Sequence, residues 1–332
     1  MIQDFGTLPD GSNVQEISLK KGKLEASVLT FGAIIRNLKV DGQPVVLGFD
    51  ALQSYLDYPN YFGAVVGRCA NRIANGNMTI DGVSYQLDRN ENGMNQLHGG
   101  VKGFSNRNWQ IEQSDKASVL LKLVSEDGDM GYPGHVEVLV RYTLTGAGAL
   151  RIKISATTDK PTPVNLSQHS YFNLDGSDTI LDHSVEIAAD SYLPVDDVLI
   201  PTGEIRKVAW TPYDFQDGRT VRRKSGEDGV IYDHNFCLTE EKRDAVEFAA
   251  AVEAGNSDLR MEVWTTEPGI QFYDAAKLDV PVVGSDGRRY GPYAGLCLES
   301  QGWPNSVNQP TFPDTLLRPE ETYNHITEFR FS

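Results

Sequence analysis

A histidine set among small polar and aromatic residues is the part of this sequence best suited to proton transfer. His169 lies in the segment Asn165-Leu-Ser-Gln-His-Ser-Tyr-Phe-Asn-Leu174, directly after the turn-forming Pro161-Thr-Pro163. The unperturbed pKa of histidine is about 6.5, so its surroundings decide its charge near neutral pH. A lone histidine in such a segment more often has a structural role, and proton transfer would also need a partner base.

A carboxylate within an apolar segment is a candidate for that base. Glu299 lies in Leu296-Cys-Leu-Glu-Ser-Gln301. An ionised glutamate is costly to bury without a partner, so a buried Glu299 would have to pair or to bind a proton. Strand alternation from Leu298 leaves two orientations open, with the carboxylate either buried or in solvent.

Two arginines lie in another polar segment. Gly67-Arg-Cys-Ala-Asn-Arg-Ile-Ala-Asn-Gly76 contains Arg68 and Arg72 among residues too small to cover them. A guanidinium offers five donors in a planar fork, which suits neighbouring hydroxyls or a carboxylate. A lone arginine is nevertheless more often a member of a structural ion pair.

A second histidine lies beside two glycines, in Asn95-Gln-Leu-His98-Gly-Gly100. Glycines permit tight backbone turns and the close approach of a ligand. The aromatic residues that follow, Phe104 and Trp109, could cover the apolar face of a sugar. A histidine in a glycine turn is equally well explained as a local cap.

Metal and nucleotide motifs are missing from the sequence. None of its six histidines has a second histidine at zinc-motif spacing, and His234 has only Asp233 as a neighbouring ligand type. Ligands that converge from distant strands would escape this test. The glycine-rich phosphate-binding loops are absent too. We therefore expect neither a metal nor a cofactor.

Charge and cysteine content restrict the partners and the compartment. The formal net charge of -16 disfavours nucleic acid and anionic lipid surfaces, which would be repelled. Met1–Phe5 shows no basic segment followed by an apolar one, and no window is apolar enough for a membrane span. The three widely spaced cysteines fit neither a disulfide framework nor a compact zinc site. We expect a reduced, cytoplasmic protein, either a monomer or a homodimer.

Short segments with two-residue alternation dominate the chain. Clear examples are 118–124, 135–144 and 150–155, and Asp-Gly pairs such as Asp81-Gly82 separate such segments. Many short strands without regular intervening helices indicate an all-β fold, an antiparallel sandwich or barrel. No linker divides the sequence, so residues 1–332 are expected to form a single domain.

Two segments are less clear. Residues 51–57 could form a short helix, and the alanines and charges of 240–253 favour a helix on propensity alone. However, the turn residues 255–258 precede another strand-like segment, 259–266. We therefore predict that 246–252 is a hairpin strand, because tertiary pairing overrides weak local propensity.

Seven segments of the sequence, taken together, resemble the aldose 1-epimerase family, the galactose mutarotases. A single match would be weak, whereas seven in sequence order, from about Gly63 to Phe331, are specific. The segments are Asn71-Arg-Ile-Ala-Asn-Gly76, Leu97-His-Gly-Gly100, Gly131-Tyr-Pro-Gly134, Asn165–Leu174, Pro194-Val-Asp-Asp197 with Ile200-Pro-Thr-Gly203, Tyr232-Asp-His-Asn-Phe236 and Leu298-Glu-Ser-Gln301.

The resemblance implies a large single-domain β-sandwich, the galactose mutarotase-like supersandwich. It also implies cofactor-free interconversion of the α and β anomers of a free aldose, a monosaccharide such as galactose or glucose. By position, His169 matches the general acid of the family and Glu299 its general base. Arg72, His98 and Asp233 match residues that hold the sugar hydroxyls.

The sequence departs from the family pattern twice, with Pro304-Asn305 where Pro-Asp is usual and Pro319-Glu-Glu321 where Pro-Gly-Glu is usual. Neither departure touches an expected proton-transfer residue. The two departures put only the local turn geometry and the sugar preference in question.

Anomer exchange requires one proton to leave the anomeric hydroxyl while another reaches the ring oxygen, so an ionised carboxylate and an imidazolium could do both. Unperturbed pKa values near 4.3 and 6.5 leave histidine mostly neutral at pH 7. We therefore expect the pocket to raise the pKa of His169, through Asp233 or Glu299.

Three other functions remain open. A glycoside hydrolase could use Glu299 and Asp233 as its carboxylate pair. A sugar-binding sandwich without catalysis needs only amides and aromatic rings. A hexose-6-phosphate 1-epimerase would need an additional cationic clamp, for which Arg68 and Arg107 are the candidates.

Overall fold

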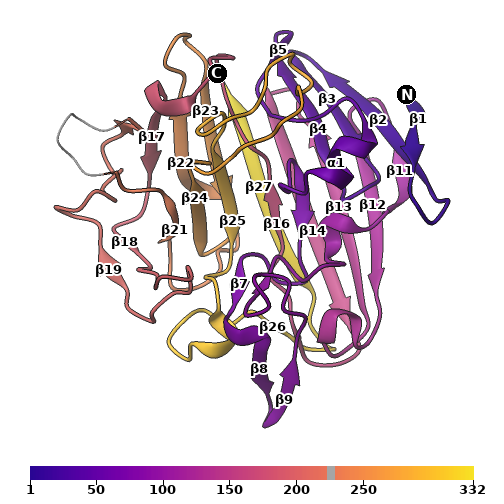
Figure 1. Ribbon diagram of the computed structural model, residues 1–332, viewed down its shortest axis with the longest axis vertical. Coiled ribbons are helices and arrows are strands. Elements are labelled where there is room, and N and C mark those ends of the chain that lie inside the picture. The colour runs from indigo at the N-terminus through magenta and orange to yellow at the C-terminus, as the bar shows by residue number, and fades with distance from the viewer. Residues whose placement is uncertain (223–228) are drawn as a thin grey trace.

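The computed structural model describes residues 1–222 and 229–332, and these form a β-protein (Figure 1). All the strand pairs in these two ranges are antiparallel, so the predicted all-β antiparallel class is confirmed. Within them, no helix has the length and apolar character that a bilayer span requires.

The largest sheet has nine strands and follows from clear two-residue alternation. In β13, for example, buried and half-buried residues alternate along the whole strand, so one face covers the core. In spatial order the strands are β11 (Gln110–Ser114), β12 (Ser118–Ser125), β13 (Val136–Leu144), β14 (Ala149–Thr158), β27 (Tyr323–Phe331), β23 (Arg260–Thr265), β22 (Glu247–Glu253), β17 (Ser184–Ile187) and β20 (Arg219–Thr220).

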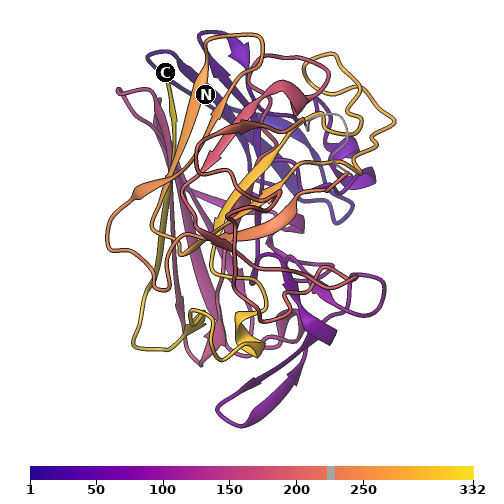
Figure 2. The ribbon, with the colours of Figure 1, turned by 90° about the vertical axis from the view of Figure 1, so that its left-hand side faces the viewer.

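Two five-stranded sheets face this large sheet, which Figure 2 shows along one side of the molecule. One hydrophobic core joins the layers, with Val28, Val138 and Ile270 each contributed by a different sheet. The first sheet contains β1 (Ile2–Thr7), β2 (Asn13–Lys21), β3 (Leu24–Leu29), β4 (Ile35–Val40) and β5 (Gln43–Pro44). The second contains β19 (Arg206–Lys207), β18 (Ser191–Tyr192), β21 (Asp233–Cys237), β24 (Gly269–Tyr273) and β25 (Cys297–Gln301).

Short strand pairs complete the fold between the sheets and at one end of the molecule. The turn between β8 and β9 consists of Asp81 and Gly82, both with positive φ, as a two-residue hairpin turn requires. The pairs are β6 (Ala64–Val66) with β16 (Ser167–His169), β7 (Arg72–Ile73) with β10 (Gln96–Leu97), β8 (Asn77–Ile80) with β9 (Val83–Gln86), and β15 (Thr162–Pro163) with β26 (Leu316–Leu317).

Both of the less clear segments fold as predicted. A short helix, α1, spans Leu52–Asp57, and it packs Leu52 and Tyr55 into the protein. The segment 246–252 falls in β22, which pairs with β23 as a hairpin. Its alanines are buried, so pairing and burial override their helix propensity. Single-turn 3-10 helices lie at Ala74–Gly76, Phe104–Asn106, Asp129–Gly131, Ile180–Asp182 and Ser306–Asn308.

Candidate active site

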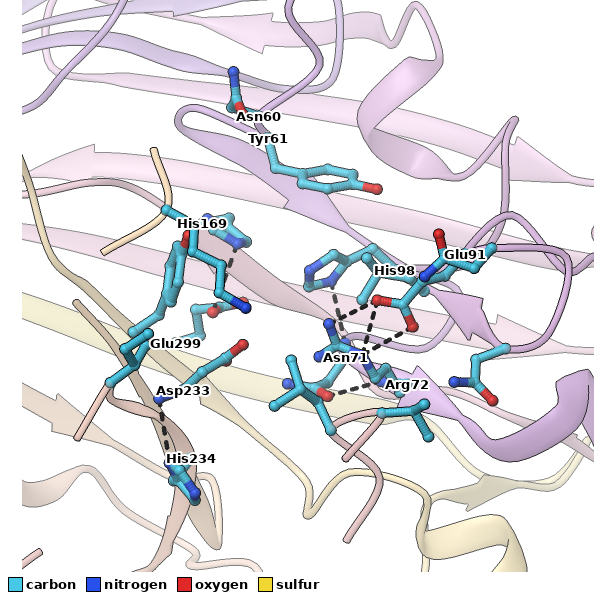
Figure 3. Close-up of a pocket in the computed structure, with 18 of the residues that line it drawn as sticks. Asn60, Tyr61, Asn71, Arg72, Glu91, His98, His169, Asp233, His234 and Glu299 are labelled. Atoms are coloured by element: carbon cyan, nitrogen blue, oxygen red, sulfur yellow. Dashed lines mark hydrogen bonds and ion pairs between the residues drawn. The ribbon is translucent and has the colours of Figure 1, made fainter. Parts of the chain in front are cut away.

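A cavity of about 650 Å³ lies where β16, β25 and β21 meet the loops that precede β7 and β10. Such a volume is in the usual range for small-molecule sites. Figure 3 shows the polar side chains that point into it. The structure brings all five of the site residues predicted from the sequence to its wall: Arg72, His98, His169, Asp233 and Glu299.

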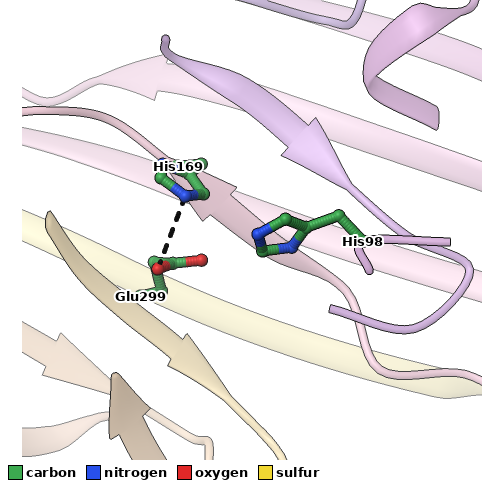
Figure 4. A group of neighbouring side chains, drawn as sticks. All are labelled: His98, His169 and Glu299. Atoms are coloured by element: carbon green, nitrogen blue, oxygen red, sulfur yellow. Dashed lines mark ion pairs between the residues drawn. The ribbon is translucent and has the colours of Figure 1, made fainter. Parts of the chain in front are cut away.

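His169 and Glu299 face each other in the cavity (Figure 4). The imidazole Nε2 lies 3.6 Å from the carboxylate Oε1, and the two side chains are only 5% and 3% exposed. The strands that carry them are held together by the Ser167 hydroxyl, which donates to the carbonyl of Ser300 at 2.9 Å. Of the two orientations left open for Glu299, the structure has the buried one.

Burial controls the protonation of this pair. It lowers the pKa of His169 to about 4. Burial also raises the pKa of Glu299 well above its ordinary range, helped by the charge of Asp233 and opposed by Arg72. The expectation that the pocket raises the pKa of His169 is therefore wrong, because the loss of water around a buried imidazolium outweighs the opposing hydrogen bond of the ring to its own backbone.

The backbone on both sides of His169 is held by hydrogen bonds. The Gly63 amide donates to the His169 carbonyl at 2.9 Å. The side-chain amide of Gln168 donates to the Gly63 carbonyl at 2.9 Å and accepts from the Ser170 amide at 3.0 Å. The imidazole stacks on the ring of Tyr171 at a centroid distance of 5.1 Å. The histidine therefore has little freedom to leave the cavity wall.

His98 packs edge-on against the ring of His169, at a centroid distance of 5.2 Å, and is a neutral donor. Its Nδ1 accepts a hydrogen bond from the Asn71 amide at 3.1 Å, so the proton of the neutral ring is on Nε2. Burial and the charges of His169 and Arg72 keep the pKa of His98 well below its ordinary value. Its Nε2–H can therefore donate to a ligand hydroxyl.

Arg72 is held by a carboxylate that the sequence did not reveal. Its Nε lies 2.9 Å from Glu91 Oε2 and its Nη2 lies 2.7 Å from Oε1, which makes a two-point ion pair. Both side chains line the cavity. A single sequence gives no sign of this role, because Glu91 lies in a polar segment typical of a surface loop.

Asp233 receives a hydrogen bond from a second residue that the sequence did not reveal. The Gln271 amide donates to Asp233 Oδ1 at 2.7 Å. Gln271 pairs in register with Glu299 on the neighbouring strand, so it lies between the two carboxylates. Burial raises the pKa of Asp233, while Arg72 and Gln271 oppose that shift. A polar residue within the apolar segment 269–273 was the available signal.

The cavity also gathers one set of possible metal ligands. One ligand atom from each of His98, His169 and Glu299 lies within 4.8 Å of the other two. However, the Nδ1 lone pair of His98 is used by the Asn71 amide, which leaves the hydrogen on Nε2. In this tautomer neither ring nitrogen can coordinate, so the group does not fit a resident metal ion.

The two arginines considered as a phosphate clamp do not line the cavity. Arg68 is buried elsewhere, where its Nη1 donates to the Pro133 carbonyl at 2.7 Å and its Nη2 to Ser125 Oγ at 2.7 Å. Arg107 forms an ion pair with Asp129 at 2.7 Å. Each cation is thus used within the fold.

Asn305, one of the two departures from the family pattern, contacts the segment that carries Arg72. Its Oδ1 accepts from the Ala74 amide at 3.1 Å, and its backbone is left-handed, with φ of 61°. Asparagine tolerates this conformation better than most residues. The turn is therefore built around Asn305 without strain on the site.

The model of the aldose 1-epimerase family matches residues 15–330. The chain belongs to the aldose 1-epimerase family. It is 47% identical to the galactose mutarotase of Bos taurus over 99% of this chain and 97% of the relative. It is 38% identical to the aldose 1-epimerase of Escherichia coli K12 over 97% of this chain and 96% of the relative.

Solved structures share the fold of this aldose 1-epimerase family member. An aldose epimerase homologue from C. elegans is 32% identical and superposes with a TM-score of 0.89, over 96% of this chain and 98% of that one. A galactose 1-epimerase from Lactobacillus acidophilus is 26% identical with a TM-score of 0.85, over 100% and 98% of the two chains. The galactose mutarotase-like fold expected from the sequence is thereby confirmed.

Proposed function

We propose that this protein is a mutarotase that interconverts the α and β anomers of free hexoses, galactose and glucose among them. The observation that carries the proposal is the buried imidazole of His169 at 3.6 Å from the buried carboxylate of Glu299, on the wall of a sugar-sized cavity. Relatives named galactose mutarotase, 43% to 47% identical over nearly the whole chain, support the same activity.

In the proposed mechanism, the pair opens the sugar ring by moving two protons. The Glu299 carboxylate takes the proton of the anomeric hydroxyl, and the His169 imidazolium gives its proton to the ring oxygen. The bond between the anomeric carbon and the ring oxygen breaks, which leaves an open-chain aldehyde. After rotation about the neighbouring carbon–carbon bond the ring closes on the other face, and both proton transfers run in reverse.

The catalytic pair holds one proton throughout this cycle. With the cyclic sugar the proton is on His169, and with the open-chain sugar it is on Glu299. Burial favours the second state, because it lowers the pKa of the imidazole and raises that of the carboxyl. It therefore makes imidazolium a strong acid and carboxylate a strong base, which are the properties that ring opening needs.

The remaining site residues are proposed to bind the sugar. His98 offers an Nε2–H donor, Arg72 offers the guanidinium edge that Glu91 leaves free, and Asp233 offers a carboxylate acceptor. Together these residues supply both hydrogen-bond donors and acceptors, which sugar binding requires because each sugar hydroxyl can both donate and accept. No phosphate clamp is proposed, since Arg68 and Arg107 are used elsewhere in the fold.

Polarimetry tests this function directly. Freshly dissolved α-galactose and α-glucose should reach their anomeric equilibrium much faster with the protein than without it, whereas glucose 6-phosphate should be a poor substrate. Saturable sugar binding without acceleration would instead indicate a binding protein. Release of reducing ends from a panel of glycosides would indicate a hydrolase, and either result would overturn the proposal.

We further propose a single cytoplasmic domain, present as a monomer or a homodimer. The main hydrophobic core draws residues from Ile17 to Phe331, which supports one folding unit. The three cysteines are buried and free, which suits a reducing compartment. Sedimentation analysis tests the oligomeric state, and cell fractionation tests the compartment.

A further inference from the structure

We propose that Cys297 is a positioning residue that sets the tautomer of His169 through a hydrogen bond with the ring nitrogen facing away from the base. The Cys297 Sγ lies 3.5 Å from Nδ1 of His169, within the range for a hydrogen bond to sulfur. The kinetic consequence rests on the proposed mutarotase function. The tautomer of His169 can be tested without a measurement of mutarotase activity.

The strand β25 supplies both neighbours of the imidazole edge. Cys297 and Glu299 are two residues apart on β25, so their side chains lie on the same face. The thiol approaches Nδ1 at 3.5 Å, and the carboxylate approaches Nε2 at 3.6 Å. A shift of this strand would therefore move the two contacts together.

The thiol carries its hydrogen in this site. Cys297 is completely buried, and burial together with the charges of Glu299 and Asp233 raises the pKa of the thiol well above its ordinary value. A protonated thiol sulfur is a weak acceptor, so in the neutral ring Nδ1 keeps its hydrogen and donates it to Sγ. The lone pair of the ring is then on Nε2, the nitrogen that faces Glu299, so Nε2 can take back the proton that it gives to the sugar.

A thiol suits this position better than a carboxylate would. A carboxylate at Nδ1 would stabilise the imidazolium, raise the pKa of His169 and weaken it as an acid. Sulfur accepts only weakly from Nδ1–H, so it leaves the imidazolium ready to give up its proton. The other titratable rings around the imidazole, those of Tyr61, His98 and Tyr171, pack against it at centroid distances of 5.1 to 5.7 Å.

Nitrogen NMR of the sugar-free protein, labelled with 15N-histidine, tests the tautomer. The signals of His169 are assigned by their loss in His169→Gln. We expect the neutral Nδ1–H tautomer in the unmodified protein and in Cys297→Ser, whose hydroxyl can also accept. Cys297→Ala should give a mixture of tautomers. An Nε2–H tautomer in the unmodified protein, or an unchanged spectrum in Cys297→Ala, would overturn the proposal.

Kinetics with galactose give the second readout. We expect Cys297→Ala to lower kcat by about tenfold, in the range typical for the loss of a partner that fixes a histidine tautomer, with KM nearly unchanged. Cys297→Ser should recover most of that loss. The matched controls are Cys69→Ala and Cys237→Ala, which remove other buried free thiols. An equal loss of kcat in all the alanine variants would contradict a specific role.

The two readouts separate the failure of this inference from failure of the proposed function. If neither the unmodified protein nor any variant accelerates mutarotation, the proposed function is wrong. The NMR result still decides the role of the Cys297 thiol in that case. If Cys297→Ala does not fold, as judged by circular dichroism, the spectrum of the unmodified protein alone decides. The Nδ1–H tautomer there supports the inference and the Nε2–H tautomer removes it.

Discussion

The Nε2 atom of His169 lies 3.6 Å from Oε1 of Glu299, and both side chains are almost completely shielded from water. At this depth a separated charge pair is costly, so the acid and the base are best regarded as one unit that shares a proton. The distance leaves the two groups close but not in a tight ion pair. A sugar oxygen can therefore compete for either of them.

Glu299→Gln should abolish most of the activity while leaving sugar binding largely intact. The amide keeps the shape of the side chain but cannot accept the proton of the anomeric hydroxyl. Loss of a general base of this kind costs on the order of a hundredfold or more in kcat. Polarimetry with galactose gives kcat, and calorimetric titration with the same sugar gives the dissociation constant.

The matched control for that variant is Glu112→Gln, which neutralises an exposed carboxylate on β11. It should behave like the unmodified protein. A Glu299→Gln variant with the turnover of the unmodified protein would remove this residue from the mechanism.

Asp233→Asn should move the basic limb of the pH profile to lower pH. The charge of Asp233 helps to raise the pKa of Glu299, so its removal lets the pair lose the shared proton more easily. Activity needs that proton and is lost as it dissociates. We therefore expect the basic limb of the kcat/KM profile to lie at a lower pH in Asp233→Asn than in the unmodified protein.

The control for the pH experiment is Asp258→Asn, which removes an exposed negative charge from a residue that does not line the cavity. Its profile should match that of the unmodified protein. A basic limb that stays in place in Asp233→Asn would show that Asp233 and the catalytic pair titrate independently.

The sequence predicted most of the site because the chemistry depends on residue types that stand out in short segments. Histidine and arginine beside glycine, and a carboxylate inside an apolar strand, were visible without a structure. Glu91 and Gln271 were missed because their roles depend on pairing across the fold. Gln271 acquires its role only from its register opposite Glu299.

The fold was predictable to a similar extent and for a similar reason. Alternation identified β12, β13 and β14, since it reports which face of a strand is buried. The hairpin strand β22 was identified instead by the turn residues 255–258 that follow it. The order of strands in a sheet is not a local property, and β14 pairs with β27 from the far end of the chain. The pKa of His169 was predicted in the wrong direction because a sequence shows possible neighbours but not the depth of burial.

Arg72→Lys should weaken sugar binding more than it slows turnover. Lysine keeps the charge but loses the planar fork that meets both oxygens of Glu91, so the cation is no longer fixed at the cavity wall. A contact that is similar in the bound sugar and in the transition state affects KM rather than kcat. We expect KM for galactose to rise about tenfold, a change of about 1.4 kcal/mol.

An exposed arginine pair provides the control for this experiment. Arg318 contacts both oxygens of Asp81 at the surface, at 3.1 and 3.2 Å. Arg318→Lys should leave KM unchanged. If Arg72→Lys lowers kcat and leaves KM unchanged, Arg72 acts on the transition state rather than as a binding residue.

Gly99→Ala should destabilise the fold next to His98 by about 3 kcal/mol or more. Gly99 has a φ of +87°, and a Cβ built there would lie 1.8 Å from the carbonyl oxygen of Gly67. The backbone at Gly99 or at Gly67 would have to move, since the atoms that the Cβ would meet all belong to the backbone. Denaturant unfolding of the variant and of the unmodified protein gives the difference in the free energy of unfolding.

Gly82→Ala separates this clash from the cost of a positive φ alone. Gly82 has a similar φ of +81°, but a Cβ there would meet nothing within 4 Å. The alanine at this hairpin turn should therefore cost only about 1 to 2 kcal/mol, the price of the left-handed conformation. If Gly99→Ala costs no more than Gly82→Ala, the close approach between the His98 turn and Gly67 is not rigid. The turn would then be unable to fix the position of the His98 ring, and the proposed sugar donor would lose its structural support.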